Sequence, residues 1–176
     1  RTFKDVPYVT RASKDDSEDF RVAATEFETI LNSEIESLKE TVSDGYGSEW
    51  ANKKFSESET NVGRFTRAGI YALLADMTLW AEDYESCIYY SDCVIKLKKE
   101  QYAEYKEKYR TAGTVNLYNG FPLIRPSKDN DDNLGNSYAE IYGSGCSFES
   151  IFELVFVQNQ SVKNSFISSY YGSSTS

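Results

Sequence analysis

Residues 64–87 read RFTRAGIYALLADMTLWAEDYESC, and this stretch decides the fold. Large apolar residues recur in it at steps of one to three positions, at Ile70, Leu73, Leu74, Met77 and Leu79. Such spacing is typical of a helix with one broad apolar face. Small residues lie beside this face at Ala68, Gly69, Ala72 and Ala75. Because small side chains let a neighbouring helix approach closely, we expect residues 64–80 to form a helix that packs against another.

A second helix is predicted directly after the first, from Tyr84 to about Lys98. Its predicted inward-facing residues are Cys87, Ile88, Val94 and Ile95. Cations near a helix C-terminus favour the helix dipole, and the lysines there are Lys96, Lys98 and Lys99. Residues 102–109 are expected to add a shorter helical turn or two. The turn at Glu82 and Asp83 is too short for anything but an antiparallel pair.

The pattern of large and small residues in this pair resembles a tetratricopeptide hairpin. Leu74 and Ala75 give a large and a small residue on the first helix, Asp83 and Tyr84 lie at the bend, and Cys87 is small again. An ordinary antiparallel helix hairpin would carry the same pattern. No second copy follows at an offset of about 34 residues, the length of a tetratricopeptide repeat.

The segments on either side complete the predicted fold. Apolar residues at three- and four-residue steps predict another helix that ends at Val42, with Ser17 as its N-cap. Residues 111–135 are predicted to form a long loop, and residues 150–157 are the best candidate for a strand. The predicted fold class is therefore mainly α, with tetratricopeptide-like antiparallel helix pairs, long irregular loops and a short strand.

Composition excludes several functions. The chain has 176 residues, the length of one domain, and its formal net charge of −9 argues against a basic nucleic-acid-binding face. It has no histidine, which excludes a Ser-His-Asp triad and histidine-ligated zinc. Cys87 and Cys93 are six residues apart on a predicted helix and so lie on nearly opposite faces, which argues against a disulfide between them.

Three segments resemble the SusD/RagB-like proteins. Residues 1–10, RTFKDVPYVT, are similar to that family's R-x-[FY]-G-D-V-P-L-V stretch, and residues 64–87 are similar to its R-x-T-x-x-A-A-x-A-L-L-A helix pair. Residues 149–156, ESIFELVF, are similar to its E-S-I-F-E-[IL]-x-F motif. The three occur in the family's order. The sequence departs from the pattern at Lys4, where glycine is usual, at Ile70, near the usual paired alanines, and at Cys87, where alanine is usual.

The resemblance implies a role at the surface of a Gram-negative outer membrane. It implies a lipoprotein that captures glycans for uptake through a partner SusC-like TonB-dependent transporter. Residues 1–176 would then be the central part of a single helical domain, whose N-terminal lipid anchor and C-terminal part lie outside this chain. The alternative is a tetratricopeptide-type scaffold for protein–protein interaction.

Candidate ligand-binding residues come from irregular segments. A sugar ring offers an apolar C–H face that an aromatic side chain covers, and hydroxyls that polar side chains bind. The predicted loop and its neighbours supply that mixture at Tyr118, Asn119, Phe121, Arg125 and Tyr142, and another irregular segment supplies Trp50. These residues are predicted from their place in loops, since no family motif assigns them.

The sequence predicts no catalytic residues, cofactor or metal. Carboxylates are plentiful, but a glycosidase needs two at a fixed separation across a cleft, which sequence spacing does not give. Asp129, Asp131, Asn133 and Glu140 have part of the spacing of a calcium loop, but Leu134 stands where that loop needs glycine. A calcium site there stays open as an alternative.

Overall fold

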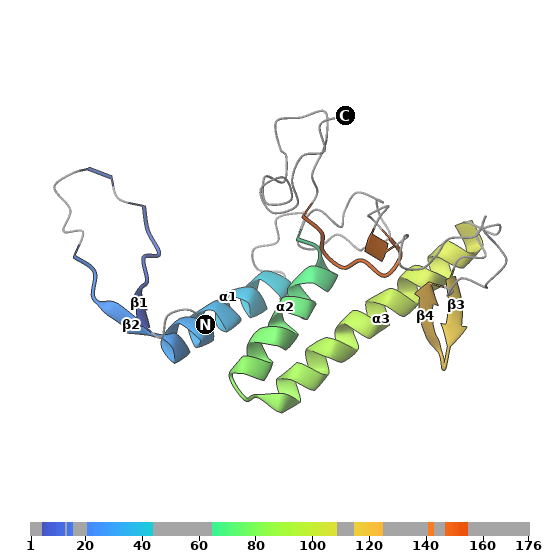
Figure 1. The fold of residues 1–176 in the computed structure, drawn as a ribbon, viewed down its shortest axis with the longest axis horizontal. Coiled ribbons are helices and arrows are strands. Elements are labelled where there is room, and N and C mark those ends of the chain that lie inside the picture. Colours follow the sequence, from blue (N-terminus) through green and yellow to red (C-terminus); the bar gives the residue numbers. More distant parts are fainter. Residues whose placement is uncertain are drawn as a thin grey trace, which may run out of the picture.

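Helices make up most of the described chain, as predicted. The computed structural model describes residues 5–12, 14–15, 21–43, 65–108, 115–124, 141–142 and 147–154. In these residues the elements are β1 (Asp5–Pro7), β2 (Ala24–Glu26), α1 (Phe27–Val42), α2 (Arg67–Trp80), α3 (Tyr84–Lys108), β3 (Val115–Tyr118) and β4 (Phe121–Ile124). Figure 1 shows α2 and α3 as a hairpin, with α1 beside α2. The predicted mainly α fold is confirmed.

Backbone hydrogen bonds close the turn between α2 and α3. Asp83 N–H donates to the carbonyl of Thr78 at 2.9 Å, and Glu82 N–H donates to the carbonyl of Leu79 at 3.2 Å. This pair of bonds is a Schellman motif, which satisfies carbonyls at a helix C-terminus. The motif places Glu82 at φ 60°, in the left-handed region where glycine is usual. A glutamate therefore holds a position at which its Cβ costs free energy.

Side-chain caps begin both helices of the hairpin. Thr66 Oγ1 accepts a hydrogen bond from Gly69 N–H at 3.2 Å and caps α2. Asp83 Oδ1 accepts one from Ser86 N–H at 3.1 Å at the start of α3. Hydrogen bonds from the Ser86 side chain and backbone lower the pKa of Asp83. The same turn thus ends one helix and starts the next.

The central core lies where the three helices meet. It consists of Leu31 and Ile35 from α1 and Ile70 and Leu74 from α2, and Tyr90 of α3 packs against it. Leu38 and Val42 from the second half of α1 also pack against this core, so the contact runs along most of that helix. The predicted apolar faces of these two helices are therefore the faces that meet.

Ala68, one of the small residues predicted to lie where another helix packs, is found in the contact between α2 and α3. Ala68 is buried and packs against Leu97 of α3 and against Ile151. Ala75 and Cys87, which were expected at the helix crossing, are only half-buried. The prediction that Ile88 faces inward is wrong, because its side chain is 65 % exposed.

Gly69 is not needed to admit a neighbouring helix, contrary to expectation. A Cβ at this position would have Thr66 Oγ1 as its nearest neighbour at 3.7 Å, which is an ordinary contact. Because glycine lowers helix stability, Gly69→Ala is expected to raise the free energy of unfolding by about 0.5–1 kcal/mol. Urea unfolding followed by circular dichroism measures this change, and a loss of stability would show that α3 does need the space.

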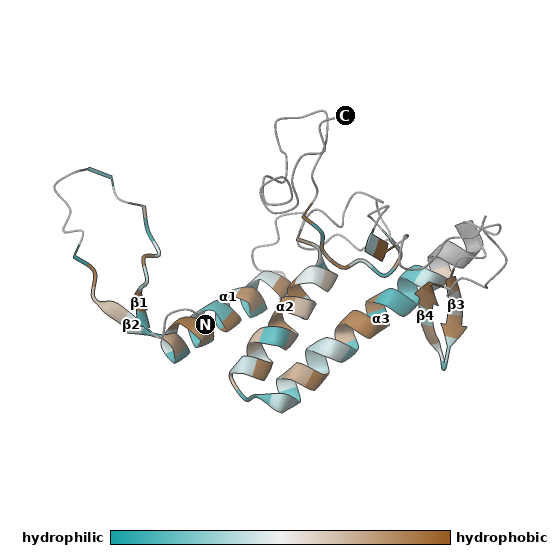
Figure 2. Cartoon of the chain, viewed as in Figure 1, coloured by the Kyte–Doolittle hydropathy of each residue, from teal (hydrophilic) through white to brown (hydrophobic). Residues whose placement is uncertain are grey.

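A second core joins the far end of α3 to the β3–β4 hairpin. Val115 and Ile124 of the hairpin and Phe148 are buried together. Residues 111–135 were expected to be a long loop, but residues 115–124 form two antiparallel strands with Tyr118 opposite Phe121. Figure 2 shows hydrophobic residues on both strands and a hydrophilic tip. The hairpin buries Val115 and Ile124 against Phe148 and Tyr102 of α3, so this segment is part of a core and is not a solvated loop.

Lys98 of α3 connects this second core to residues 148–150. It was predicted near the end of its helix, but it lies near the middle of α3. Its ammonium group donates hydrogen bonds to the carbonyls of Phe148 and of Ser150, the latter at 2.8 Å. The ammonium group also lies 5.2 Å from the centre of the Phe148 ring. Glu149 accepts a hydrogen bond from Ile124 N–H at 2.7 Å, so the turn at residues 147–150 also binds β4.

The strand predicted for residues 150–157 is not found in its described part. Residues 150–154 run without a strand partner, and residues 155–157 lie outside the described chain. The Ser150 side chain instead donates a hydrogen bond to Glu153. The β-branched residues of this segment favoured a strand. In the structure its polar groups instead form local hydrogen bonds and accept a hydrogen bond from Lys98.

The N-terminal helix is shorter than predicted. It begins at Phe27, while Ser17 lies outside the described residues. Residues 24–26 form β2, which pairs antiparallel with β1, so part of the predicted helix is a strand. Tyr8, just after β1, donates a hydrogen bond to Glu34 of α1. In the part of the chain that is described, no helix is long and apolar enough to cross a membrane.

Candidate functional site

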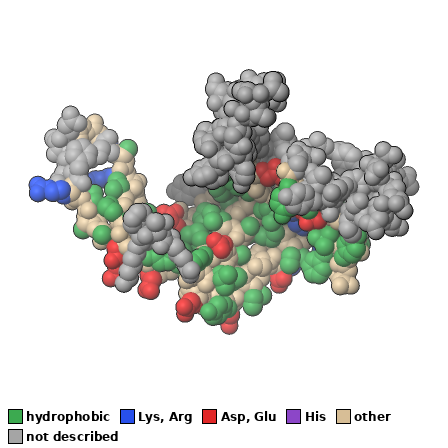
Figure 3. Space-filling view, viewed as in Figure 1, with side chains coloured by type: hydrophobic (Ala, Val, Ile, Leu, Met, Phe, Trp, Pro, Cys, Tyr) green, Lys and Arg blue, Asp and Glu red, His purple; other side chains and the backbone are tan. Residues whose placement is uncertain are grey.

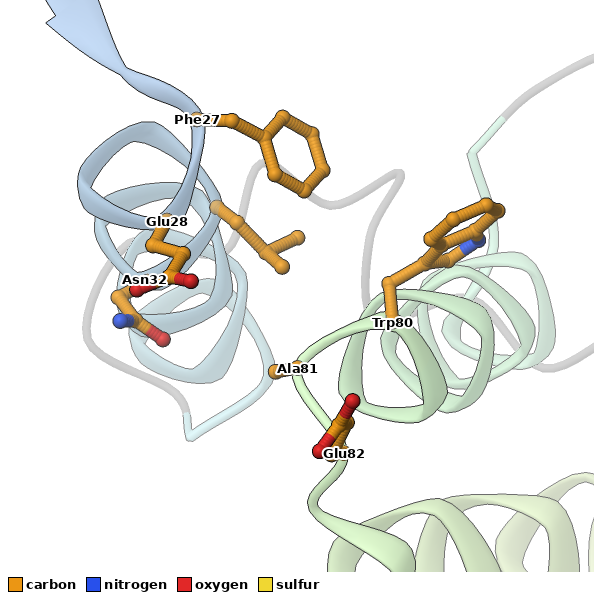
Figure 4. A pocket seen from close by; sticks show the side chains of 7 residues that line it. Phe27, Glu28, Asn32, Trp80, Ala81 and Glu82 are labelled. Carbon is orange, nitrogen blue, oxygen red and sulfur yellow. The ribbon is translucent and has the colours of Figure 1, made fainter. Parts of the chain in front are cut away.

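A cleft of about 320 Å³ lies between the start of α1 and the end of α2. We call it the aromatic cleft, and its lining residues are Phe27, Glu28, Leu31, Asn32, Trp80, Ala81 and Glu82. The volume is at the lower end of the range for small-molecule sites, roughly 300–1,000 Å³. Figure 4 shows this cleft from close by.

Two aromatic rings form the mouth of the aromatic cleft. In Figure 4, Phe27 projects from α1 and Trp80 from α2, and both rings lie on the same side of the cleft. Phe27 is 40 % exposed and Trp80 is 37 % exposed, so each ring keeps a surface that a ligand can cover. Leu31, one helical turn after Phe27, is buried in the central core and fixes the separation of the two helices. The two rings therefore line the same cleft as a residue of the central core.

Polar groups from two elements line the rest of the cleft. Glu28 and Asn32 lie one turn apart on α1, and Glu82 comes from the turn after α2 (Figure 4). They supply carboxylate oxygens, which accept hydrogen bonds, and an amide, which both donates and accepts. No lysine or arginine is among the described residues that line the cleft. The aromatic cleft thus combines flat apolar surfaces with negative charge.

Glu82 places its carboxylate in the cleft at the cost of backbone strain. Placing a non-glycine residue in the left-handed region costs roughly 1–2 kcal/mol of folding free energy. Glu82→Gly is therefore expected to raise the free energy of unfolding by about 1 kcal/mol. Glu82→Ala is the matched control, because it removes the same carboxylate and keeps a Cβ at φ 60°. Thermal unfolding compares the three proteins, and equal melting temperatures for the glycine and alanine variants would contradict the strain.

The residues predicted from the sequence as ligand contacts lie elsewhere. Tyr118, Asn119 and Phe121 meet at the tip of the β3–β4 hairpin, near the far end of α3 from the aromatic cleft (Figure 1). Lys99 of α3 lies 4.8 Å from the centre of the Phe121 ring. Tyr142 is exposed. The hairpin thus brings three of the predicted residues together, and none of them lines the aromatic cleft.

Other predicted features fall outside the described residues. These are Trp50, Arg125 and the calcium-loop-like stretch at residues 129–140. Among the described residues, no group of three acidic or cysteine side chains is arranged to hold a metal ion. Cys87 and Cys93 are not joined by a disulfide, in agreement with their spacing.

Sequence reasoning missed Phe27, Trp80 and Glu82 as candidate ligand contacts. Phe27 lies in the segment predicted as the first helix, Trp80 ends the next predicted helix, and Glu82 lies in the predicted turn. One signal was available, because a tryptophan beside acidic turn residues at a helix end leaves a large ring partly in solvent. Comparison of the chain with protein-family models, curated proteins and solved structures gave no match.

Proposed function

We propose that the chain binds glycans at the cell surface, for uptake through a partner TonB-dependent transporter of the outer membrane. The single observation that supports binding is the aromatic cleft, where Phe27 and Trp80 flank carboxylate and amide groups. An aromatic ring covers the C–H face of a sugar and gains about 25 cal/mol for each Å² of apolar surface removed from water. The polar groups of the cleft orient the sugar by hydrogen bonds to its hydroxyls.

The transporter and the location rest on the resemblance to SusD/RagB-like proteins. Residues 1–10, 64–87 and 149–156 carry that resemblance. Proteins of that family present irregular binding surfaces on a helical scaffold, and the aromatic cleft lies at an end of α1 and of α2. On this proposal the three helices are the scaffold and the cleft is the ligand site.

Affinity electrophoresis tests the proposal directly. Native gels that contain amylopectin, xylan or laminarin retard a protein in proportion to its affinity for the polysaccharide. We expect retardation of the unaltered chain in at least one gel, and Trp80→Ala to weaken affinity by about tenfold, because one aromatic contact is lost. Phe27→Ala is expected to have a smaller effect in the same direction, because its ring is smaller.

The matched control is the pair Tyr118→Ala and Phe121→Ala, which removes two exposed aromatics from the hairpin. If glycans bind in the aromatic cleft, this variant is expected to be retarded as strongly as the unaltered chain. Loss of retardation here together with normal retardation of Trp80→Ala would move the site to the hairpin. No retardation of the unaltered chain in any gel would contradict glycan binding.

A protein-interaction scaffold is the second candidate function. It is favoured by exposed apolar side chains near the start of α3, at Tyr84, Ile88 and Tyr89. A scaffold would use this surface, while a glycan receptor would use the cleft. Ile88→Glu separates the two functions. If the protein binds glycans, the variant is expected to keep its polysaccharide retardation. If the protein is a scaffold, the variant is expected to lose peptide capture from a displayed library.

A further inference from the structure

We infer that the aromatic cleft selects glycans with free amino groups, such as glucosamine oligomers, over neutral and acidic glycans. This inference rests on the proposed function and adds a ligand class to it. It depends on the charge of the cleft and on the nature of its aromatic rings.

The charged side chains among the described residues that line the cleft are both acidic. Glu28 and Glu82 approach the cleft from two separate elements, and Asn32 supplies an uncharged amide between them in sequence. Within the described residues, neither carboxylate takes part in an ion pair. Figure 3 shows acidic side chains below α1 and around the α2–α3 turn, where hydrophobic side chains lie between them. An ammonium group in the cleft would therefore meet two carboxylates, and no lysine or arginine is among the described residues that line it.

The aromatic rings are suited to the same ligand. A cation that lies over the face of an aromatic ring is attracted by the negative charge of that face, and tryptophan is the strongest partner. Phe27 and Trp80 are both exposed at the mouth of the cleft, so an amino sugar can stack its C–H face on one ring and turn its ammonium group toward the carboxylates. A neutral sugar gains only the stacking. An acidic sugar is repelled by Glu28 and Glu82.

The net charge of the chain supports the same selection. At −9 the chain attracts cations over several ångströms, and like-charged ligands are disfavoured before they reach the site.

Isothermal titration with two oligomers of equal length tests the inference without any substitution. Chitosan oligomers carry free amines, and chitin oligomers carry the same sugar ring with each amine acetylated and uncharged. At a pH where the sugar amines are protonated, we expect the chitosan oligomer to bind about tenfold tighter, and we expect added salt to reduce this preference.

Charge-neutral variants test which carboxylates are responsible. The double variant Glu28→Gln with Glu82→Gln is expected to bind both oligomers with similar affinity. Glu85→Gln is the matched control, because it removes the same charge near the turn from a residue that does not line the cleft. It should keep the preference for the chitosan oligomer. Circular dichroism checks that each variant is folded.

Each remaining outcome is informative. Equal binding of both oligomers by the unaltered chain, lost in Trp80→Ala, would overturn the amino-sugar preference and leave the proposed function standing. A lysine-rich peptide that binds through Glu28 and Glu82, while chitosan oligomers do not, would overturn it in favour of a protein ligand. Failure of every glycan to bind would overturn both the preference and the proposed function.

Discussion

Leu74→Ala is expected to lower the free energy of unfolding by about 3–5 kcal/mol, the largest effect of any single truncation in the helices. Leu74 is 0 % exposed and lies in the core with Leu31, Ile35 and Ile70. Truncation removes the apolar contacts of a leucine and leaves a cavity between three helices that close only partly around it. Because small domains are stable by only about 5–15 kcal/mol, this loss is a large share of the total.

Leu79→Ala is the matched control for this prediction. Leu79 lies on the same helix but is 50 % exposed, so its truncation is expected to cost less than about 1 kcal/mol. Urea unfolding of both variants, followed by circular dichroism, gives the two free energies. Equal losses would show that α2 does not face α1 as described.

Raising the pH is expected to stabilise the fold through Lys98. Burial lowers the pKa of Lys98 from 10.5 to about 7, while the nearby carboxylate of Glu149 acts in the opposite direction. In the unfolded chain the side chain keeps its ordinary value. Between pH 7 and pH 10.5 the unfolded state therefore holds more protons, so the free energy of unfolding rises with pH across this window. The contribution is lost as the pH falls through the folded-state value.

Lys98→Met isolates this contribution. The variant removes the titrating group, so the difference in stability between the unaltered chain and the variant is expected to shift in favour of the unaltered chain as the pH rises. Lys96→Met is the control, since Lys96 is exposed on the same helix. It is expected to leave the pH dependence unchanged. The same pH dependence in all three proteins would show that Lys98 is not buried against residues 147–154.

Local patterns in the sequence were enough to predict the helix pair. The apolar spacing from Ile70 to Leu79 and the acidic turn at Glu82 and Asp83 act within a few residues, and the structure has α2 and the turn where these patterns predicted them. The second helix, α3, starts at Tyr84 as predicted but runs on to Lys108. The hairpin also had a local signal, because Asn119 and Gly120 form one of the strongest hairpin turns. Its strands are four residues each and Pro122 interrupts one of them, so the segment resembled a loop.

The remaining features depend on contacts between residues far apart in the chain. Lys98 bonds to carbonyls of residues 148 and 150, which no pattern around Lys98 indicates. The aromatic cleft is similar, because Phe27 and Trp80 line one cleft only when α1 and α2 pack through Leu31 and Leu74. The sequence therefore predicted aromatic and polar ligand contacts in a loop and in other irregular segments, whereas the aromatic cleft lies between two helices.

The most direct test of glycan binding at the aromatic cleft is fluorine NMR of the chain labelled with fluorotryptophan. The chain has two tryptophans, and a Trp50→Phe variant assigns the signal of Trp80. Titration with amylopectin, xylan, laminarin or chitosan oligomers is expected to shift the Trp80 signal in a saturable manner, and Phe27→Ala is expected to weaken that response. A glycan that binds by calorimetry and leaves the Trp80 signal unmoved would contradict the account.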